Sequence, residues 1–426
     1  MAHLPQVIIV GGGFAGLAAA RRLRNVACEV TLVDRYNHHV FQPLLYQVAT
    51  AGLSPGDIAS PIRWILRHQP RLRVLLANVE HIDSGAKRIR LDGPSTSLRA
   101  GGETLPYDYL IVAAGATHSY FGHDEWSEVA PGLKTLDDAL AIRRRLLIAF
   151  EEAEREPNPV YQRRLLTFVL IGGGPTGVEL AGALGEIASQ VLRSEFDAVD
   201  PAIARIILIE AGPSILPSFP ENLRESARRA LVRLGIEVRT GKAVTKVEDG
   251  AVWIGDERLD AHTILWAAGV AATPLSRDLG PNLDRVGRVI VEPDLSVPGH
   301  PGVFVAGDLA SFSHQTGSPL PGVAQVAKQQ GRHAAGNVAR LIAGGQATRP
   351  FRYFDPGNMA TIGRNNAIAD FGFLRVSGYL GWLLWLFVHV LFLIGFRNRL
   401  SVMMQWAAAY LTHQRSVRLI TRNPPG

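Results

Sequence analysis

Hydrophobic positions along the chain fall into short apolar runs and helical spacings, and one arrangement of them occurs twice. The first apolar run, Val7–Val10, is rich in β-branched residues, which is typical of a buried parallel strand. A helical stretch, Leu17–Leu23, follows it, and a second apolar run ends in Asp34. Residues 165–171 and 205–210 repeat the two apolar runs later in the chain. The pattern predicts an α/β protein with two parallel-sheet units.

The rest of the pattern predicts further elements. Apolar residues at helical spacing indicate a connecting helix over residues 135–156, which Pro157 and Pro159 end. Residues 35–60 have no clean period, and their prolines and glycines predict a structured loop with short helical pieces. Other apolar patterns predict strands at 73–79, 87–92, 105–116, 236–239, 263–269 and 303–308, and helices at 61–69, 221–234 and 324–341.

A glycine pattern joins the first strand to the first helix. Gly11, Gly13 and Gly16 have the spacing G-x-G-x-x-G. The first glycine allows a tight turn, the second lets a pyrophosphate approach the backbone, and the third lets the helix pack close to the strand. The helix N-terminus offers free N–H groups to phosphates, and Asp34 is placed to accept hydrogen bonds from an adenosine ribose. This context predicts a dinucleotide-binding unit.

The same glycine pattern follows the repeated strand. Gly172, Gly174 and Gly177 have the same spacing, and Pro175 suits the first helical turn. The next strand ends in Glu210 after a longer gap than usual, which predicts an extended helix or an insertion before it. A carboxylate here hydrogen-bonds the 2′-hydroxyl of NADH and repels the 2′-phosphate of NADPH. The second unit is therefore predicted to bind NADH.

Two dinucleotide units in one chain can hold a permanent flavin dinucleotide and a nicotinamide dinucleotide. The segment VFVAGD at 303–308 supports this, because its Asp308 can hydrogen-bond the ribityl chain of FAD. The strand over 105–116 ends in small residues and Gly115, and TILWAAG at 263–269 repeats that ending. Such an ending lets the backbone run close beside a bound cofactor.

The excess of positive over negative charge lies in the last part of the chain. Hydrophobic residues make up 47% of the sequence and the mean hydropathy is +0.10, which is high for a purely soluble protein. The net charge is +6, and no acidic residue follows Asp370. The arginines beyond that point are Arg375, Arg397, Arg399, Arg415, Arg418 and Arg422. They flank long apolar stretches, so anionic lipid fits this tail better than nucleic acid does.

The tail has the composition of helices that lie on a membrane. Residues 379–396 carry no formal charge at neutral pH. A spanning helix needs about 20 apolar residues, so length alone leaves that alternative open. Trp382 and Trp385 near the start, arginines after it and a second apolar helix over 400–411 favour a pair at the membrane surface. A helix pair buried in a dimer interface has the same composition and is the other alternative.

Several chemistries are not expected. A single cysteine, Cys28, allows no intrachain disulfide and no CxxC pair, and is predicted to be a small buried residue. His38 and His39 are adjacent and point apart in regular structure, so no metal site is expected. The chain enters its first strand almost at once, without the pattern of a signal peptide, so the catalytic part is expected in the cytoplasm.

The segment AQVAKQQG at 324–331 is predicted to begin a helix. Gln325 and Gln329 are four apart and share one helical face, and Ala324 permits close approach to a flat ring. The helix N-terminus can stabilise negative charge at the pyrimidine end of a reduced flavin. A polar-faced surface helix is the alternative for this stretch taken alone.

Together these motifs resemble the two-dinucleotide-domain flavoproteins. The disulfide reductases and sulfide:quinone oxidoreductases of that group use cysteines, which the single Cys28 argues against. AQVAKQQG closely resembles the quinone-site motif of the type II NADH:quinone oxidoreductases, the non-pumping NADH dehydrogenases. Other segments similar to that family are FQPLLYQVATAGLSP (41–55), GGGPTGVELAGALGE (172–186), MATIGRNNAIAD (359–370) and GFRNRLSVMMQWAAAYLTHQRSVRLI (395–420). The resemblance spans nearly the whole chain.

The resemblance implies roles for matching residues. Gly11, Gly13, Gly16, Asp34 and Asp308 correspond to FAD, and Gly172, Gly174, Gly177 and Glu210 to NADH. Further cofactor-binding positions expected are Phe14, Ala15, Arg35, Pro43, Leu44, Ala114, Gly115, Pro175, Thr176, Ala268, Gly269, Gly307, Ala324 and Gln325. Gln325 and Gln329 correspond to the quinone face. Glu179 matches an acid between the nicotinamide and flavin regions, where proton transfer and capping of the helix dipole both stay open.

The implied fold has two Rossmann-like domains, the second inserted in the first, and a C-terminal amphipathic membrane-anchoring region. The implied ranges are 1–120 and 285–345 for FAD, 121–284 for NADH, and 346–426 for anchoring. The implied activity is hydride transfer from NADH to FAD, then two-electron reduction of a membrane quinone without proton pumping. A peripheral position on the cytoplasmic side, a homodimer and no nucleic acid partner are expected. The alternatives are a soluble NAD(P)H:acceptor reductase and a slow NADH-sensing flavoprotein.

Overall fold

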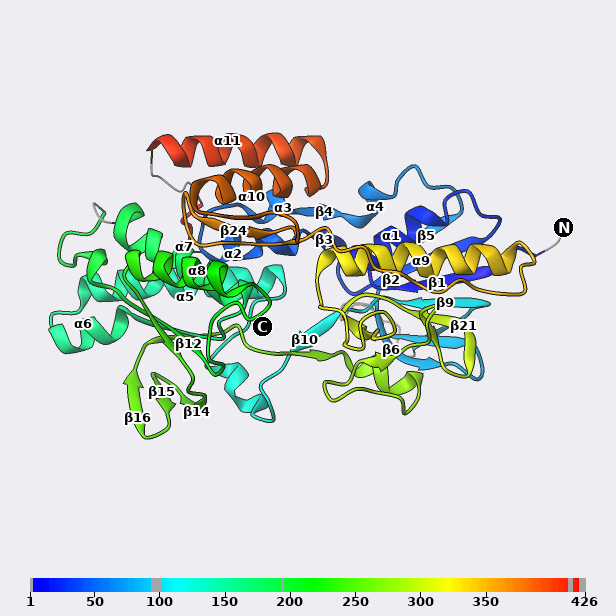
Figure 1. Ribbon diagram of the computed structural model, residues 1–426, viewed down its shortest axis with the longest axis horizontal. Helices are drawn as coiled ribbons and strands as arrows, with labels where there is room; N and C mark the ends of the chain where they lie inside the picture. The colour runs from blue at the N-terminus through cyan, green and yellow to red at the C-terminus, as the bar shows by residue number, and fades with distance from the viewer. Residues whose placement is uncertain (1–2, 93–101, 193–194, 413–416, 421–426) are drawn as a thin grey trace. The chain divides into compact units, whose positions relative to one another are not determined.

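The chain folds into two compact units. The computed structural model describes residues 3–92, 102–192, 195–412 and 417–420 (Figure 1). The first unit is formed by Met1–His39, Ser60–Thr117 and Val270–Pro356. The second unit is formed by Val40–Ala59, His118–Gly269 and Gly357–Gly426. Each unit is built around its own parallel sheet, as the repeated hydrophobic pattern predicts.

A six-stranded sheet forms the centre of the first unit. The strands in spatial order are β20 (Ser296–Val297), β21 (His300–Val305), β9 (Tyr109–Val112), β1 (Gln6–Val10), β2 (Glu29–Asp34) and β5 (Leu72–Leu76). Strand β1 pairs in parallel with β2 and β9, whereas β20 at one edge is antiparallel. Four consecutive residues of β1 are buried, which is the pattern of a sheet covered on both faces.

Two helices of the first unit pack closely against each other. Helices α1 (Phe14–Arg22) and α9 (Ala324–Ile342) run side by side (Figure 1). A Cβ atom at Gly331 of α9 would lie 2.1 Å from the carbonyl oxygen of Ala15. The helix backbones can approach this closely because position 331 lacks a side chain.

Residues 105–116 do not form the single strand expected from their apolar run. They are divided among β8 (Glu103–Pro106), β9 and β10 (Ala116–His118). Strand β8 belongs to a three-stranded sheet with β6 (Asn78–Asp83) and β7 (Arg88–Asp92). The chain changes sheets at Asp108, whose carboxylate accepts a hydrogen bond from the Gln6 N–H at 2.7 Å. The apolar pattern could not show this change of partner strands.

The helix expected over 61–69 is also much shorter than predicted. The structure has one turn, α4 (Ile62–Ile65). Pro70 disfavours a helical conformation at the residue before it, Gln69. The side-chain Nε2 of Gln69 instead donates to the carbonyl oxygen of Ala20 at 2.5 Å. The other short elements of the first unit and of its boundaries are β3 (His38–Val40), β4 (Ala59–Pro61), β18 (Val270–Ala272), η5 (Pro274–Leu279), β19 (Val289–Ile290), η6 (Gly307–Leu309) and β22 (Ala310–Ser311).

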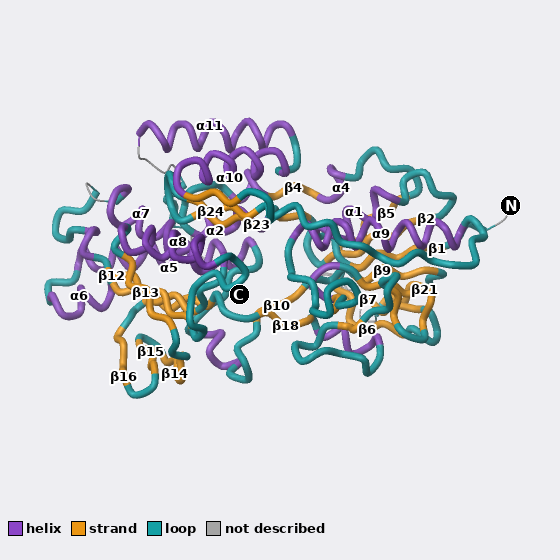
Figure 2. The backbone as a smooth tube through the Cα atoms, viewed as in Figure 1, coloured by secondary structure: helices purple, strands orange, loops and turns teal. Residues whose placement is uncertain are grey.

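The second unit has a four-stranded parallel sheet (Figure 2). Its strands in spatial order are β13 (Ile236–Thr240), β12 (Arg205–Glu210), β11 (Thr167–Ile171) and β17 (Thr263–Trp266). Three of its helices are α5 (Leu136–Arg155), α7 (Pro175–Glu186) and α8 (Glu221–Arg233). A π-helical turn, η3 (Ile187–Val191), extends α7, so of the two alternatives predicted before Glu210, an extended helix or an insertion, the structure shows the helix to be extended.

Shorter elements complete the second unit. They are η1 (Gln42–Leu44), α2 (Leu45–Ala49), α3 (Pro55–Ile58), η2 (Asp124–Glu128), α6 (Pro159–Leu165), η4 (Pro201–Ile203), β14 (Val244–Glu248), β15 (Ala251–Ile254), β16 (Glu257–Asp260), β23 (Asn358–Thr361), β24 (Ala367–Asp370) and β25 (Arg375–Ser377). Residues 41–58 contain the short helical pieces expected there.

The C-terminal apolar stretch forms two helices, α10 (Gly378–Phe392) and α11 (Phe396–Thr412). The break lies at Leu393, which has extended backbone angles. Across the described residues, we find no helix with the length and apolar character needed to cross a membrane. One side of α10 packs on β24, where a Cβ at Gly381 would lie 2.4 Å from the Ala367 carbonyl oxygen. The large apolar residues that α10 leaves exposed are Tyr379, Leu380, Leu383, Phe387, Leu391 and Phe392.

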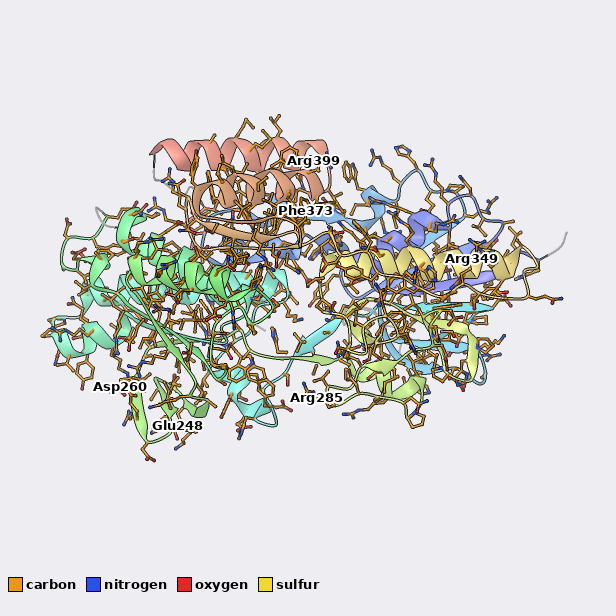
Figure 3. All side chains as sticks on the ribbon, in the orientation of Figure 1. Glu248, Asp260, Arg285, Arg349, Phe373 and Arg399 are labelled. Carbon is orange, nitrogen blue, oxygen red and sulfur yellow. The ribbon has the colours of Figure 1, made fainter. Side chains whose placement is uncertain are left out.

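The tail arginines whose side chains the structure describes bind other parts of the protein. Arg375 pairs with Asp370 at 3.6 Å, and Arg418 pairs with Glu195. Arg399 (Figure 3) donates from Nε to the Leu393 carbonyl at 2.9 Å, which satisfies the end of α10. The Arg397 side chain, Arg415 and Arg422 lie outside the described residues.

Replacement of Gly331 by alanine should destabilise the protein by about 2 kcal/mol or more, because α1 and α9 must separate to admit the methyl group. The matched change Gly336→Ala on the same helix is the control. There the nearest atom to an added Cβ is Arg22 Nε at 3.9 Å, so better helix propensity should leave stability unchanged or raised by up to about 1 kcal/mol. Thermal unfolding of both variants measures the difference, and equal effects would contradict the close packing at Gly331.

Candidate functional site

The first glycine turn is held by the acid that follows it in the chain. Gly11 has a φ of +100°, and a Cβ at Gly16 would lie 1.8 Å from the Gly11 carbonyl oxygen. The Asp34 carboxylate accepts from the N–H groups of Gly12 at 2.5 Å and Tyr36 at 2.7 Å. Burial raises the pKa of Asp34, and these two N–H groups offset part of that rise. The space beside Gly13 is open, so a ligand can approach this backbone.

The second glycine turn repeats these contacts. Gly172 has a φ of +114°, and a Cβ at Gly177 would lie 1.9 Å from the Gly172 carbonyl oxygen. The Glu210 carboxylate accepts from the N–H groups of Gly173 at 2.6 Å and Gly212 at 2.7 Å. The space beside Gly174 is again open. The two glycine turns therefore have the same geometry. In each, the acid at the end of the next strand accepts a hydrogen bond from the N–H of the residue after the first glycine, Gly12 or Gly173.

The third predicted cofactor segment, residues 303–308, ends beside α9. The N–H of Gly307 donates to Gln330 Oε1 at 2.7 Å, and Gln330 is almost fully buried. The Asp308 carboxylate lies next to Gly322, where an added Cβ would be 3.3 Å from Oδ1. The Lys328 ammonium lies 5.3 Å from the centre of the Phe14 ring. These contacts bring Gly307, Asp308 and the first turns of α9 beside the first glycine turn.

Gln329 is bound to a loop of its own unit. Its Nε2 donates to the Phe354 carbonyl at 2.8 Å, and its Oε1 accepts from the Phe354 N–H at 3.0 Å. Gln315 makes the same pair of bonds with Tyr353, at 3.0 Å and 2.8 Å. In this geometry Gln329 holds the loop that contains Tyr353 and Phe354 against α9. Gln325, one turn earlier, is partly buried.

His39 was not among the predicted site residues, yet it lies at the first glycine turn. Its ring packs edge-on against Phe14, with 4.8 Å between centroids, and its Nδ1 lies 3.2 Å from the Gly12 carbonyl oxygen. Burial lowers the pKa of His39 to about 4, so the ring is neutral at pH 7. Its buried Nε2 has no hydrogen-bond partner among the described residues. No sequence pattern indicates this contact, because it joins β3 to a turn 27 residues earlier in the chain.

Glu179 lies in the first half of α7 in the second unit. It keeps part of its surface exposed, but the surrounding protein is dense, and this burial raises its pKa to about 8. The Thr361 N–H, at 3.5 Å from Oε1, offsets only part of the rise. An acid with this pKa holds its proton at neutral pH and can release it near that value.

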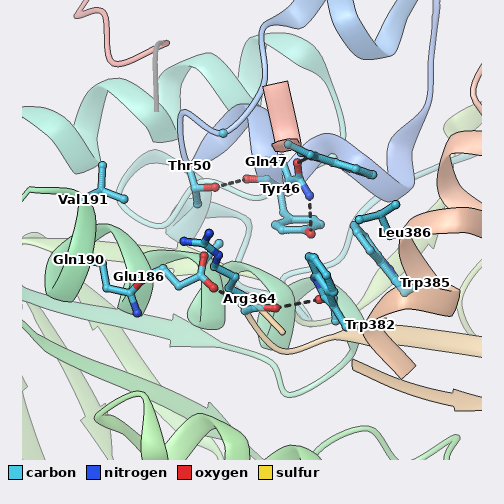
Figure 4. A pocket seen from close by; sticks show the side chains of 15 residues that line it. Tyr46, Gln47, Thr50, Glu186, Gln190, Val191, Arg364, Trp382, Trp385 and Leu386 are labelled. Atoms are coloured by element: carbon cyan, nitrogen blue, oxygen red, sulfur yellow. Dashed lines mark hydrogen bonds between the residues drawn. The ribbon is translucent and has the colours of Figure 1, made fainter. Parts of the chain in front are cut away.

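A cavity of about 120 Å³ lies within the second unit (Figure 4). Its lining includes three tryptophans, Trp382, Trp385 and Trp406, and two charged residues, Glu186 and Arg364. The remaining lining residues are Tyr46, Gln47, Thr50, Gly52, Ala183, Gln190, Val191, Thr361, Gly363 and Leu386. A flat ring with polar substituents suits such a cavity, because apolar walls hold the ring and a few polar groups orient it.

Polar contacts bind α11 to the second unit beside this cavity. The buried Asp57 carboxylate accepts from Ser401 Oγ at 2.8 Å and Gln405 Nε2 at 2.9 Å. Trp406 Nε1 donates to Gln47 Oε1 at 2.8 Å. These bonds fix α11 to the loop over residues 41–58 even though most of the helix is apolar.

The predicted site residues divide between the two units. Those in the first are Gly11, Gly13, Phe14, Ala15, Gly16, Asp34, Arg35, Ala114, Gly115, Gly307, Asp308, Ala324, Gln325 and Gln329. Those in the second are Pro43, Leu44, Gly172, Gly174, Pro175, Thr176, Gly177, Glu179, Glu210, Ala268 and Gly269. Among the described residues, no group of three or more His, Cys, Asp or Glu side chains has the arrangement to hold a metal ion.

Comparisons with known proteins agree with this arrangement. Residues 5–331 match the pyridine nucleotide-disulphide oxidoreductase family, and residues 356–415 match the NDH2 C-terminal domain. The type II NADH:quinone oxidoreductase Ndh of Mycobacterium tuberculosis is 43% identical over 98% of this chain and 90% of its own length. The mitochondrial internal alternative NAD(P)H-ubiquinone oxidoreductase A1 of Arabidopsis thaliana is 31% identical over 96% of this chain and 84% of its own.

The fold is also found among solved structures. The structure of NDH2 from Plasmodium falciparum in complex with NADH has a TM-score of 0.86 at 19% identity, and the match covers 99% of this chain and 100% of that chain. The sulfide:quinone oxidoreductase from Aquifex aeolicus has a TM-score of 0.73 at 18% identity, with 98% of this chain and 96% of that chain covered. At these identities the likeness establishes the fold.

Replacement of Glu179 by glutamine should change how stability depends on pH. Between the usual pKa of 4.5 and the folded value of about 8, the folded protein keeps a proton that the unfolded chain has released. Stability therefore falls as pH rises through that window. Glutamine mimics the protonated acid, so its advantage should grow by on the order of 2 kcal/mol from about pH 5 to about pH 8 in urea unfolding. A difference that stays constant over that range would show that Glu179 ionises at its usual value.

Proposed function

Because the chain belongs to the type II NADH:quinone oxidoreductases, we propose that it passes electrons from NADH through FAD to a membrane quinone without pumping protons. The matches to this family confirm the resemblance noted in the sequence. The observation that carries the proposal is the pair of glycine turns, each closed by a carboxylate at the end of the next strand.

The first unit is the proposed FAD site. Its open backbone at Gly13 and the N-terminus of α1 suit a pyrophosphate, and Asp34 suits a ribose. Asp308 and the first turn of α9, with Ala324 and Gln325, are proposed to line the ribityl chain and the ring. The unpartnered Nε2 of His39 fits this use, because a bound dinucleotide would supply the polar atom that the described residues do not.

The second unit is the proposed NADH site. The N-terminus of α7 begins at Pro175, next to the open backbone at Gly174, and is suited to the pyrophosphate of the nucleotide. Glu210 is placed to accept from a ribose 2′-hydroxyl, as an acid at the end of this strand does in other dinucleotide sites. When bound, a flavin supplies two-electron chemistry that side chains lack. Glu179 is proposed to hold or release the proton that accompanies this transfer, which its pKa of about 8 suits.

We propose that the quinone meets the C-terminal helices. Relatives that this chain matches are quinone oxidoreductases by name, and the cavity lined by Trp382, Trp385 and Trp406 fits a flat ring. Exposed apolar side chains such as Leu380 and Phe387, at 66% and 65% exposure, suit the headgroup and acyl region of a bilayer. The enzyme is proposed to lie on the cytoplasmic face, where NADH is found.

The purified protein tests this proposal directly. Bound flavin should give its absorbance bands, NADH should bleach them without oxygen, and quinone should restore them. Steady-state turnover with a short-tail quinone separates an enzyme from a slow NADH sensor. A protein without flavin absorbance, or one whose flavin is not reduced by NADH, would contradict the proposal.

Replacement of Glu210 by glutamine should narrow the preference for NADH over NADPH. The carboxylate opposes a 2′-phosphate by like-charge repulsion, and glutamine removes that charge. We expect the ratio of kcat/KM values to fall by about tenfold or more, mostly through a lower KM for NADPH. Asp34→Asn changes the corresponding acid of the other glycine turn and should leave the ratio unchanged. Equal use of both nucleotides by the unaltered enzyme would contradict the role of Glu210.

Replacement of Gln329 by leucine should slow reoxidation of the flavin by quinone by about tenfold while flavin reduction by NADH changes much less. Gln315→Leu is the matched control, because it removes the same pair of bonds from the neighbouring loop residue Tyr353. Stopped-flow measurement of the two half-reactions separates a quinone role from loop fixing. Equal slowing by both variants, or equal loss in both half-reactions, would remove Gln329 from the proposed quinone face.

A further inference from the structure

A basic and aromatic surface of the first unit has no part in the proposed electron transfer. Residues 58–79 contain no acidic residue. The exposed polar and aromatic side chains that form what we call the basic surface are Arg63, Trp64, Arg67, His68, Arg71 and Arg73. Within the described part of the chain, no ion pair joins these arginines to an acid. The positive charge of this surface is therefore free to meet an outside partner.

The core of the first unit holds the basic surface in place. Ile62 and Leu66 are buried, and Ile62 lies beneath the first glycine turn, where its Cδ1 would be 2.5 Å from a Cβ at Gly12. The Ile62 N–H donates to the Asn37 carbonyl at 2.9 Å. Arg71 Nη2 donates to the Val26 carbonyl at 3.2 Å. The outward side chains thus project from a fixed backbone, so the backbone loses little conformational entropy when they bind.

Trp64 and Arg67 form an exposed pair. Trp64 is 46% exposed, and the Arg67 guanidinium carbon lies 4.5 Å from the centre of a Trp64 ring. Arg67 Nη1 also donates to the Trp64 carbonyl at 2.7 Å. Tryptophan with a neighbouring cation is typical of the membrane–water interface, where the ring sits among headgroups and the cation meets phosphate.

Protection of the sheet edge does not account for all of this surface. β5 is the edge strand of the six-stranded sheet, and charged residues such as Arg73 on an edge strand prevent pairing with another chain. An exposed tryptophan works against that purpose, because it adds apolar area to the edge. Its presence among cations fits a partner that has both apolar and anionic groups.

We propose that the basic surface binds anionic phospholipid headgroups and forms a membrane contact separate from α10 and α11. The inference rests on the proposed function only in that the enzyme works at a membrane. The C-terminal region contributes apolar side chains, and its described arginines, Arg375, Arg399 and Arg418, are bound within the protein. The first unit thus adds positive charge complementary to anionic lipid, on side chains that have no acidic partner among the described residues.

Vesicle binding by the full-length enzyme tests this contact. We would compare vesicles of phosphatidylcholine alone with vesicles of equal parts phosphatidylcholine and phosphatidylglycerol. Arg63→Gln/Arg67→Gln should weaken binding to the anionic vesicles by about tenfold or more, with little effect on the neutral ones. The matched control Arg88→Gln/Arg285→Gln removes the same charge from exposed arginines of the first unit (Arg285 is labelled in Figure 3) and should change binding far less.

A fluorescent label reports the contact itself. The one cysteine of the chain, Cys28, is buried, so Trp64→Cys can be labelled selectively with an environment-sensitive dye. Its emission should shift to shorter wavelength with anionic vesicles, and the same dye on Arg285→Cys should not shift. An unshifted dye at position 64, or equal loss of binding by the two double variants, would overturn the proposal.

Other outcomes are distinguishable. If the unaltered enzyme binds neither kind of vesicle, the proposed membrane function fails as well as this contact. If the enzyme binds anionic vesicles but the double variant binds them equally well, this contact alone fails. If Arg63→Gln/Arg67→Gln weakens binding of the enzyme to a DNA oligonucleotide but leaves vesicle binding intact, the surface binds nucleic acid and the lipid proposal is overturned. Turnover of NADH with a small soluble acceptor should stay normal in both double variants.

Discussion

The two binding units depend on one constraint, which is the close approach of a helix to the strand before it across a glycine turn. Gly16 and Gly177 each lie where an added Cβ would overlap the carbonyl oxygen of the first glycine of the turn. A carboxylate at the end of the next strand then accepts a hydrogen bond from the N–H of Gly12 or Gly173. Contacts within the protein thus hold the strand, helix and acid together, and the space beside Gly13 and Gly174 at the helix N-termini is open. Such preorganisation reduces the conformational entropy lost on binding.

Helix α9 extends the same constraint to the third cofactor segment. Three consecutive residues make three different contacts: Gln329 binds the Phe354 backbone, Gln330 binds the Gly307 N–H, and Gly331 admits α1. Because successive helical residues point about 100° apart, one short stretch can hold a loop, a turn and a helix at once. The segment AQVAKQQG, which the sequence predicts to face a ligand, therefore also holds neighbouring parts of the first unit together.

The C-terminal helices combine apolar exposure with polar attachment. Composition alone fits a membrane surface, a dimer interface or a span, and the structure adds that α11 is bound to the rest of its unit through Asp57, Ser401 and Gln405. The buried Asp57 carboxylate also accepts from the Ser54 N–H, and these three hydrogen bonds replace the solvation lost on burial. The break at Leu393 is likewise satisfied by Arg399. These helices are part of the fold of the second unit and leave one apolar side exposed.

The sequence by itself determined the two glycine turns, the acids that end the following strands, the repeated order of strand and helix, and the family. These follow from local rules, since a positive φ, a missing Cβ and the spacing of apolar residues act within a few neighbouring positions. Only the tertiary structure decided that residues 105–116 divide among three sheets, that Gln329 binds Phe354, and that His39 lies at the first glycine turn. Each of these depends on a partner from a distant part of the chain, and hydrophobic periodicity carries no information about which distant groups meet.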